Sequence, residues 1–185
     1  DPDAVEDFCA NHCTLKEDGL YNNKTGARVR ALGVVHVFGN MADMPRLLDI
    51  ARRYKLILIE DATEALGTRY TAGPLAGKAA GTMGDIGCYS FNGNKIMTTG
   101  AGGFVVSNHA DWAEHAKHLS TQAKADMLQF LHDEVGYNYR MTNVQACLGL
   151  AQLERLEGFV ETKKARYDQY KAALDGVHGL RILPF

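Results

Sequence analysis

The sequence predicts an α/β fold whose central sheet is mostly parallel. Two short apolar runs, residues 31–37 and 55–60, flank a helical pattern that extends over residues 44–54. Within the second run, residues 56–59 are all apolar, and the lack of alternation is typical of a parallel strand buried on both faces. A strand, a helix and a second strand in this order form the basic unit of an α/β domain.

Two further strands are expected after a glycine-rich stretch at residues 73–84. They cover residues 86–91 and 103–107, and the segment between them is rich in turn-forming residues, including Gly100 and Gly102. We expect these two strands to pair with each other.

Helices dominate the rest of the chain. One is expected at residues 111–119, and another begins at Thr142, where Thr142 and Gln145 have the spacing of a capping box. Apolar residues then recur at helical spacing, and we expect this second helix to continue past Glu161.

The composition excludes two classes of partner. Lys and Arg number 20 and Asp and Glu number 22, so the net charge of −2 provides no basic surface for nucleic acid. The longest apolar runs are far shorter than the ~20 residues that a membrane-spanning helix needs. With 185 residues, 46% of them hydrophobic, the chain can bury one sizeable core. We therefore expect a globular domain that binds neither nucleic acid nor membrane.

The cysteines favour a reducing compartment. Cys9, Cys13, Cys88 and Cys147 lack the paired C-x-x-C spacing of a zinc site. No signal peptide is recognisable, so we expect reduced thiols and a cytoplasmic location. Cys9 and Cys13 would share one face of a helix, but no second pair of ligands accompanies them. The chain begins with Asp-Pro rather than Met, which suggests a piece of something longer.

Carboxylates stand at the end of the strand predicted at residues 55–60. In an open α/β sheet, ligands bind beyond the carboxyl ends of the strands, and this strand carries Glu60, Asp61 and Glu64 to that edge. A buried carboxylate raises the proton affinity of a cationic partner, as is needed to keep a pyridinium nitrogen protonated. Spacing alone leaves open whether Asp61 has this role or caps a following helix.

Lys95 lies just beyond the strand predicted at residues 86–91, in an Asn-Gly-Asn turn. A partly desolvated lysine has a lowered pKa, and its neutral amine can attack a carbonyl and form a Schiff base. A solvated loop lysine is the commoner case. Ser90 and Asn92 nearby, with the glycines that follow, favour a ligand-binding role.

Two nucleotide-binding motifs are absent from the sequence. A phosphate loop requires Gly, four residues, and then Gly-Lys-Ser/Thr. The only Gly-Lys pair, Gly77-Lys78, has Ala72 and Ala79 at the other required positions. No G-x-G-x-x-G segment follows a predicted strand either.

Histidines form the last candidate group. His109, His115 and His118 lie on or near the helix predicted at residues 111–119. Because no carboxylate or cysteine stands at complementary spacing, we favour a solvated helix face and expect no metal. His36 ends the first strand and either approaches a ligand or is a hydrogen-bonded edge histidine.

Five motifs occur in order along the chain: VHVFGN at 35–40, IEDATEALG at 59–67, SFNGNKI at 90–96, TTGAGG at 98–103 and GYNYR at 136–140. Together they resemble the DegT/DnrJ sugar aminotransferases over nearly the whole chain. NGNKI at 92–96 and HDEVG at 132–136 are most similar to the branch that aminates C4 of UDP-linked 4-keto-6-deoxy sugars, as in legionaminic acid synthesis.

The resemblance implies a fold, a cofactor and a reaction. The fold would be the large domain of aminotransferase fold type I, with residues 1–155 in the cofactor-binding domain and residues 156–185 in a connecting helix and the start of a small domain. The cofactor would be pyridoxal 5′-phosphate. The reaction would pass an amino group from an amino acid, glutamate by expectation, to a nucleotide-linked keto sugar.

The resemblance also implies roles for five residues. Lys95 matches the lysine that forms the Schiff base and moves the proton, Asp61 the partner of the pyridine nitrogen, and Glu64 the residue near the 3-hydroxyl. Ser90 matches a phosphate ligand. Asn138 matches an asparagine that reaches the cofactor of the neighbouring subunit, so a homodimer with shared active sites is expected.

Three departures from the family pattern leave alternatives open. Thr63 stands where a small residue, usually Ala, is expected, Ala101 stands where Gly or Glu is common, and the chain is shorter than family members. One alternative is a sugar dehydratase of the same fold, which carries His in place of the lysine, so the presence of Lys95 argues against it. The other, which the short length keeps open, is a non-catalytic remnant or regulatory binding domain.

Overall fold

The computed structural model describes residues 1–126 and 128–184. Its elements divide into two compact units: residues 1–90 with 103–140, and residues 91–102 with the chain from 141 onward. In chain order the elements are α1 (Pro2–Asn11), β1 (Cys13–Lys16), β2 (Gly19–Asn22), β3 (Arg28–Val29), β4 (Ala31–Val35), η1 (Val37–Gly39), α2 (Met44–Arg53), β5 (Ile57–Asp61), β6 (Ile86–Ser90), β7 (Gly103–Ser107), α3 (Ala110–Ser120), β8 (Lys124–Asp126), β9 (Leu131–His132), α4 (Asn143–Leu153), α5 (Leu156–Leu174) and η2 (Val177–Gly179).

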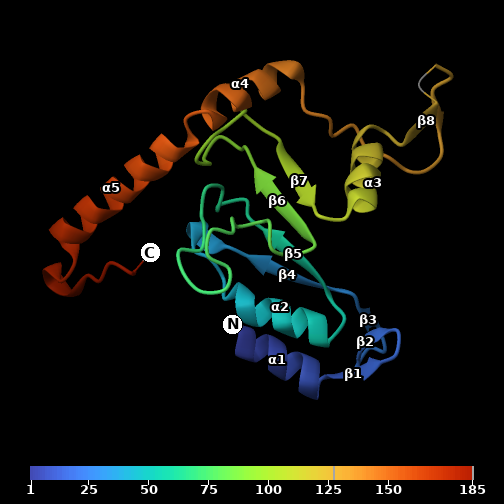
Figure 1. The fold of residues 1–185 in the computed structure, drawn as a ribbon, viewed down its shortest axis with the longest axis horizontal. Coiled ribbons are helices and arrows are strands. Elements are labelled where there is room, and N and C mark those ends of the chain that lie inside the picture. Colours follow the sequence, from blue (N-terminus) through green and yellow to red (C-terminus); the bar gives the residue numbers. More distant parts are fainter. Residues whose placement is uncertain (127, 185) are drawn as a thin grey trace. The chain divides into compact units, whose positions relative to one another are not determined.

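A four-stranded sheet in the order β4-β5-β6-β7 forms the centre of the first unit (Figure 1). The pairs β4–β5 and β5–β6 are parallel, and β7 pairs with β6 antiparallel along its whole length. The predicted α/β class with a parallel-dominated sheet is therefore confirmed, as is the predicted pairing of the strands around residues 86–91 and 103–107.

Strand β5 differs from its prediction in one respect. Its burial alternates: Leu58 and Glu60 are buried, whereas Ile57, Ile59 and Asp61 are half-buried. The expectation of full burial on both faces is therefore wrong for this strand, because one face packs more tightly than the other.

Helix α2 covers one face of the sheet with an apolar stripe. Met44, Leu47, Ile50 and Ala51 recur at helical spacing and are all buried. The Asp43 side chain caps the first turn, and two arginines in the last turn complement the helix dipole. These signals start and end the helix within a residue of the predicted range.

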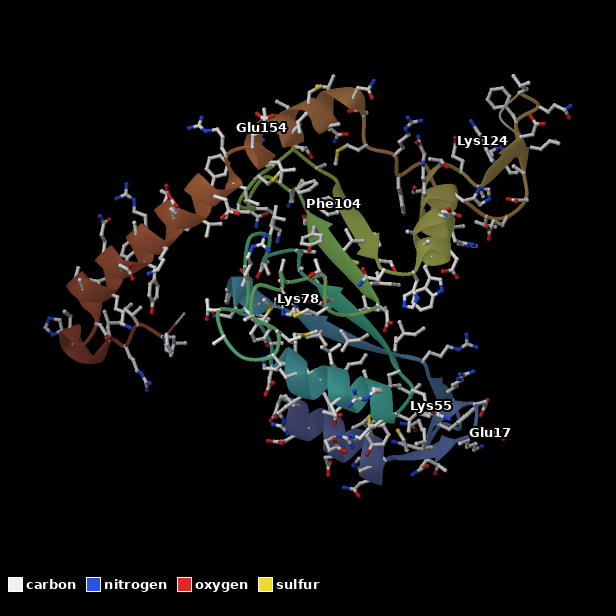
Figure 2. The ribbon with its side chains drawn as sticks, viewed as in Figure 1. Glu17, Lys55, Lys78, Phe104, Lys124 and Glu154 are labelled. Carbon is white, nitrogen blue, oxygen red and sulfur yellow. The ribbon has the colours of Figure 1, made fainter. Side chains whose placement is uncertain are left out.

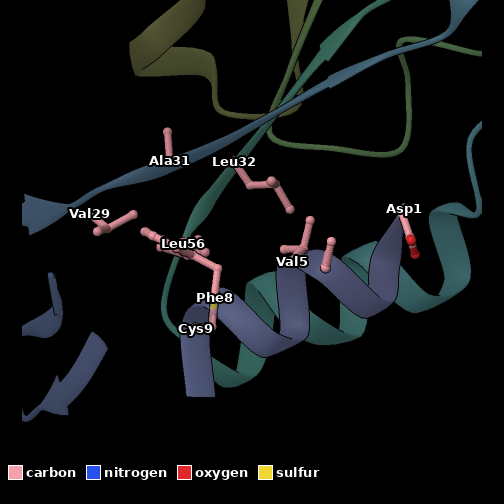
Figure 3. Close-up of a pocket in the computed structure, with 9 residues that line it drawn as sticks. Asp1, Val5, Phe8, Cys9, Val29, Ala31, Leu32 and Leu56 are labelled. Atoms are coloured by element: carbon pink, nitrogen blue, oxygen red, sulfur yellow. The ribbon is translucent and has the colours of Figure 1, made fainter. Parts of the chain in front are cut away.

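Helix α1 lies beside α2 and was not predicted (Figure 1). Arg53 on α2 forms an ion pair with Glu6 on α1, and the Tyr54 hydroxyl donates to the same carboxylate at 2.9 Å. The Arg53 guanidinium holds the pKa of Glu6 at about 2. An apolar pocket between α1 and β4 is lined by Val5, Phe8 and other residues of both elements (Figure 3).

A small antiparallel sheet, β1-β2-β3, follows α1. Cys13 lies in β1 and Cys9 in α1, so the two thiols are not on one helix and the condition for a shared helix face is not met. The chain turns between the two at His12. All four cysteines are free.

Lys55 reaches back to the β1-β2-β3 sheet, and its ammonium donates to the Glu17 carbonyl at 2.7 Å (Figure 2).

The second unit contains α4, α5 and the loop of residues 91–102. The predicted capping box is confirmed, since Gln145 N donates to Thr142 Oγ1 at 3.3 Å and Thr142 N donates to Gln145 Oε1 at 3.1 Å. One continuous helix past Glu161 is not observed. The φ of Arg155 is −112°, which interrupts the helix between α4 and α5.

The Gln152 side chain of α4 is hydrogen-bonded to the loop of residues 91–102. Gln152 accepts from the backbone N–H of Thr98 at 3.0 Å and donates to the Thr98 carbonyl at 2.6 Å.

Within the described residues, no helix is long and apolar enough to cross a membrane. The domain boundary at residue 155 stays a prediction.

Candidate active site

Asp61 is the last residue of β5 and lies at the carboxyl edge of the parallel sheet. It is opposite Cys88 of β6 in the strand register, and Ser90 ends β6 two residues later. Because β5 and β6 are parallel, their carboxyl ends meet at the same edge. The structure thus brings Asp61 and Ser90, both half-buried, to the ends of neighbouring strands.

The alternative that Asp61 caps a helix does not hold. Its Oδ1 accepts from the backbone N–H of Thr63 at 3.1 Å, but residues 62–72 form turns rather than a helix. Burial raises the pKa of the Cys88 thiol, and the negative charge of Asp61 raises it further. The Asp61 carboxylate therefore acts electrostatically on the neighbouring strand.

Glu60, one residue before Asp61, points into the core and is fully buried. Its Oε2 accepts from Gly81 N at 2.8 Å, and its Oε1 accepts from Met83 N at 2.6 Å and Gly84 N at 2.5 Å. Burial alone would raise the pKa of Glu60, but these hydrogen bonds and one from His36 lower it on balance. Glu60 is therefore a structural carboxylate and not, as its position suggested, a group at the ligand edge.

His36 is the fully buried partner of Glu60. Its Nε2 is 2.9 Å from Glu60 Oε2, while the backbone N–H of Ala42 donates to its Nδ1 at 3.2 Å. A nitrogen that accepts an N–H bond carries no proton, so the ring proton is on Nε2 and is donated to Glu60. Of the two readings left open for His36, the hydrogen-bonded histidine is the one observed.

Close backbone approach explains the glycines in the segment that binds Glu60. A Cβ on Gly81 would lie 2.6 Å from the Tyr89 hydroxyl, and one on Gly87 would lie 1.9 Å from the Gly81 carbonyl. Such contacts exclude any side chain at Gly87. The segment therefore packs directly on β6, where the Tyr89 ring also packs against Phe104 of β7. Figure 2 labels Phe104 on its strand.

Glu64 supports the loop that follows β4. Its Oε2 accepts from the backbone N–H of Phe38 at 2.7 Å. Phe38 has a φ of +54°, in the region that non-glycine residues seldom occupy, and the hydrogen bond offsets part of that strain. Glu64 is exposed at the same end of the sheet as Asp61.

Lys95 lies in the second unit, in the turn that follows Phe91. Its backbone N–H donates to the Asn92 carbonyl at 3.1 Å, and the residue is half-buried. The loop is closed by Phe91 N donating to the Gly102 carbonyl at 2.9 Å and by Thr99 N donating to the Phe91 carbonyl at 3.0 Å. Lys95 is therefore held in an ordered turn and is not a fully solvated loop lysine.

Asn138 lies beside the end of α3, where it forms an isolated antiparallel bridge with Thr121. Its neighbours Tyr137 and Tyr139 stack with ring centroids 5.1 Å apart. Tyr137 N donates to the Leu119 carbonyl at 2.7 Å, and Gly136 packs against Gln122 so closely that a Cβ there would clash. The backbone of this exposed segment is thus clamped, with Asn138 on the surface.

The residues of the first unit fit a phosphorylated pyridine cofactor. A carboxylate such as that of Asp61 can pair with a pyridinium nitrogen, and a hydroxyl such as that of Ser90 can donate to phosphate. Both stand at the carboxyl edge of parallel strands, where open α/β sheets bind their ligands.

The family model of the DegT/DnrJ/EryC1/StrS aminotransferases matches residues 8–185. The chain belongs to this family. The resemblance seen in its five motifs is therefore confirmed.

Similar proteins support the same assignment. The chain is 41% identical over 150 residues to the GDP-perosamine synthase of Escherichia coli O157:H7, covering 81% of this chain and 40% of that protein. It is 40% identical over 161 residues to EpsN of Bacillus subtilis, provisionally named a pyridoxal phosphate-dependent aminotransferase, covering 87% of this chain and 40% of that protein. The chain thus spans about 40% of the length of these relatives.

Solved structures agree with the fold. The aminotransferase TlmJ from Streptoalloteichus hindustanus superposes with a TM-score of 0.79 at 31% identity, covering 88% of this chain and 43% of that one. A DegT DnrJ EryC1 StrS aminotransferase from Brucella abortus gives a TM-score of 0.76 at 28% identity, covering 87% of this chain and 42% of that one. The predicted fold of the aminotransferase large domain is confirmed.

Sequence reasoning missed the buried His36–Glu60 pair. Its signal was present: a glutamate inside an otherwise apolar strand, with a histidine at the end of the preceding strand. Such a glutamate requires a buried partner. The roles predicted for Lys95, Asp61 and the other site residues stay predictions.

Proposed function

We propose that the protein is a pyridoxal 5′-phosphate-dependent aminotransferase that aminates C4 of a UDP-linked 4-keto-6-deoxy sugar, with glutamate as amino donor. One observation carries the proposal: in a chain of this family, Asp61 ends β5 directly beside the end of β6, where Ser90 stands. Relatives named GDP-perosamine synthase and UDP-4-amino-4,6-dideoxy-N-acetyl-β-L-altrosamine transaminase, the latter 34% identical and from Campylobacter jejuni, support a nucleotide-linked sugar as substrate.

The proposed residue roles are those that the family resemblance implies, and the positions of Asp61 and Ser90 at the carboxyl edge of the sheet support them. Pyridoxal phosphate supplies an electron sink when it is bound. The Asp61 carboxylate would pair with the pyridine nitrogen, Ser90 would donate to the phosphate, and Glu64 would lie near the 3-hydroxyl. Lys95 would hold the cofactor covalently through Nζ, and the same amine would act as the general base and acid of the 1,3-proton shift in each half-reaction.

A shared active site would complete the enzyme. Asn138 is exposed on a segment whose backbone is fixed on both sides, so its amide can donate to a group outside its own subunit. We propose a homodimer in which Asn138 binds the phosphate of the partner subunit's cofactor. The four free cysteines support a cytoplasmic location.

The test is covalent labelling. The purified protein is incubated with pyridoxal phosphate, reduced with borohydride and mapped by peptide mass spectrometry. Label on Lys95 is expected, with no label in Lys95→Ala and normal label in Lys78→Arg, which changes a lysine in an exposed turn. Label on another lysine, or none, contradicts the assignment.

The substrate is tested separately from the cofactor. Unreduced protein loaded with pyridoxal phosphate is mixed with glutamate. Release of 2-oxoglutarate is then measured with UDP-linked and GDP-linked 4-keto-6-deoxy sugars as acceptors. Turnover with the UDP sugar alone supports the proposal. Turnover with the GDP sugar alone keeps the aminotransferase and overturns the nucleotide.

A further inference from the structure

Two histidines and two carboxylates meet outside the proposed active site, at the end of α3. His118 Nε2 is 2.7 Å from Asp133 Oδ1 and 3.6 Å from Glu134 Oε1, and His115 Nε2 is 3.5 Å from the same Glu134 oxygen. The ligand atoms of His118, Asp133 and Glu134 all lie within 4.8 Å of one another. The sequence-based expectation that no carboxylate accompanies these histidines is therefore wrong: the β8–β9 hairpin folds residues 133–134 back against α3 (Figure 1).

We propose that His118, Asp133 and Glu134 bind a divalent cation of the zinc class, with His115 as a fourth ligand. Imidazole nitrogen and carboxylate oxygen are established zinc ligands, at bonds of ~2.0–2.2 Å. Tetrahedral bonds of this length place ligand atoms roughly 3.3–3.5 Å apart, close to the observed separations. His118 and Asp133 lie closer together than this, at 2.7 Å, and His115 is outside the group whose ligand atoms all lie within 4.8 Å of one another, so side-chain rotation is needed to complete the site.

Charge favours the same ligand. The imidazole of His118 carries at most one positive charge, whereas Asp133 and Glu134 together carry two negative charges within its reach. A divalent cation neutralises both carboxylates. It also replaces the hydrogen bond between His118 and Asp133 by two stronger metal–ligand bonds.

The backbone holds the ligands in place before a cation arrives. Ala123 N donates to the His118 carbonyl at 2.9 Å, and Asp133 N donates to the Ala123 carbonyl at 3.2 Å. Ala123 is fully buried, with a φ of +49°. This fixed turn joins α3 to residues 133–134, so cation binding requires no refolding.

Occupancy would also affect the segment that follows. Residues 136–139 begin two positions after Glu134 and are hydrogen-bonded to residues 119–122. A cation that bridges α3 and residues 133–134 would therefore slow local opening of the segment that carries Asn138.

The measurement is calorimetric titration of tag-free protein with zinc chloride. One zinc per chain is expected in the wild type. The affinity for zinc should fall about a hundredfold or more in Glu134→Gln, because loss of a residue that only hydrogen-bonds to a metal ligand already lowers metal affinity about ten- to a hundredfold. Glu134→Gln keeps the His118–Asp133 hydrogen bond, so it reports on metal binding in a folded protein. His118→Gln should abolish binding.

A second His–Asp pair provides the matched control. His109 Nε2 is 3.0 Å from Asp85 Oδ1, and no third metal ligand joins that pair within residues 1–126 and 128–184. His109→Gln should leave zinc affinity unchanged. Hydrogen exchange of residues 133–139 should slow on zinc addition in the wild type and in His109→Gln, but not in Glu134→Gln. Absence of binding in the wild type, or binding that survives Glu134→Gln unchanged, overturns the site.

Discussion

At the scale of single residues, neighbouring carboxylates on one strand have different tasks. Glu60 and Asp61 are adjacent in sequence, yet pleating directs Glu60 into the core and leaves Asp61 half-buried at the strand end. Three backbone N–H groups and His36 satisfy Glu60. Asp61 accepts from Thr63 N through Oδ1, at the strand end where we propose the pyridinium partner.

Replacing Glu60 by Gln should destabilise the fold. The new amide group would direct its N–H bonds toward backbone N–H donors or toward the protonated Nε2 of His36, so buried donors would lose their acceptor. A buried donor that is left without its acceptor costs about 1–3 kcal/mol. Urea unfolding at neutral pH measures the loss, and Glu157→Gln, an exposed site on α5, is the control. Equal stability of the two variants would refute the importance of this network.

The same residue predicts a dependence on pH. The pKa of Glu60 is lowered from 4.5 in the folded chain, so its contribution is fully present above about 4.5 and is lost as the pH falls through the folded-state pKa. Acid should therefore cost the wild type more unfolding free energy than it costs Glu60→Gln. Parallel pH profiles of the two proteins would show that Glu60 does not contribute.

Replacing Asp61 by Asn should remove activity while sparing the fold. Asn keeps an oxygen that can accept from Thr63 N, but it lacks the charge that holds the pyridine nitrogen protonated. Turnover should fall by orders of magnitude with an unchanged melting temperature. The control is Asp111→Asn, an exposed site in the first turn of α3. A near-normal rate in Asp61→Asn would count decisively against the role.

At the scale of elements, helix starts are encoded more sharply than helix ends. Thr142 and Gln145 form both hydrogen bonds of the capping box, and α4 begins at the next residue, Asn143. The break at Arg155 has no comparable signal, because neither Gly nor Pro stands there. This is why a single helix past Glu161 was expected.

Loss of the cap should weaken α4. Thr142→Ala removes the acceptor for Gln145 N and should cost about 1 kcal/mol. Thr162→Ala is the matched control, because Thr162 lies inside α5 and Ala favours a helix interior. Thermal unfolding compares them: a lower melting temperature is expected for Thr142→Ala only, and an equal effect of both changes would contradict the capping role.

At the scale of the whole molecule, the proposed dimer predicts that one subunit alone cannot form a complete active site. If Asn138 donates to the partner subunit's cofactor, the interface is isologous and each subunit lends the same residue. Loss of one hydrogen bond to phosphate should weaken cofactor binding by roughly 1.5–3 kcal/mol. Asn138→Ala should therefore require more pyridoxal phosphate for half-saturation, which a spectroscopic titration measures.

Mixing two variants, each inactive or crippled as a homodimer, tests the sharing itself. A dimer of one Asn138→Ala subunit and one Lys95→Ala subunit places both lesions in one site and leaves the other site intact. Activity up to half of the wild-type value per dimer is expected to return. If tagged mixed dimers form and remain inactive, the shared-site proposal for Asn138 fails.

Local sequence patterns predicted most strands of the central sheet in the first unit, and they identified the family. Apolar runs predicted β4, β5, β6 and β7 to within a few residues, because strand burial leaves its mark on consecutive positions. Helix α1 and the β1–β3 sheet were missed, since their short segments have mixed polarity and depend on packing. Motif order then identified the family, which composition alone would not have done.

The sequence by itself determined which chemical groups are available and roughly where each stands: a carboxylate at a strand end, a lysine in a turn, an asparagine between tyrosines. Tertiary structure decided which groups meet. It alone buried Glu60 against His36, 24 residues away, and carried Asp133 back to His118, 15 residues away. Periodicity reports only contacts between near neighbours, whereas these pairs depend on how strands and hairpins fold against one another.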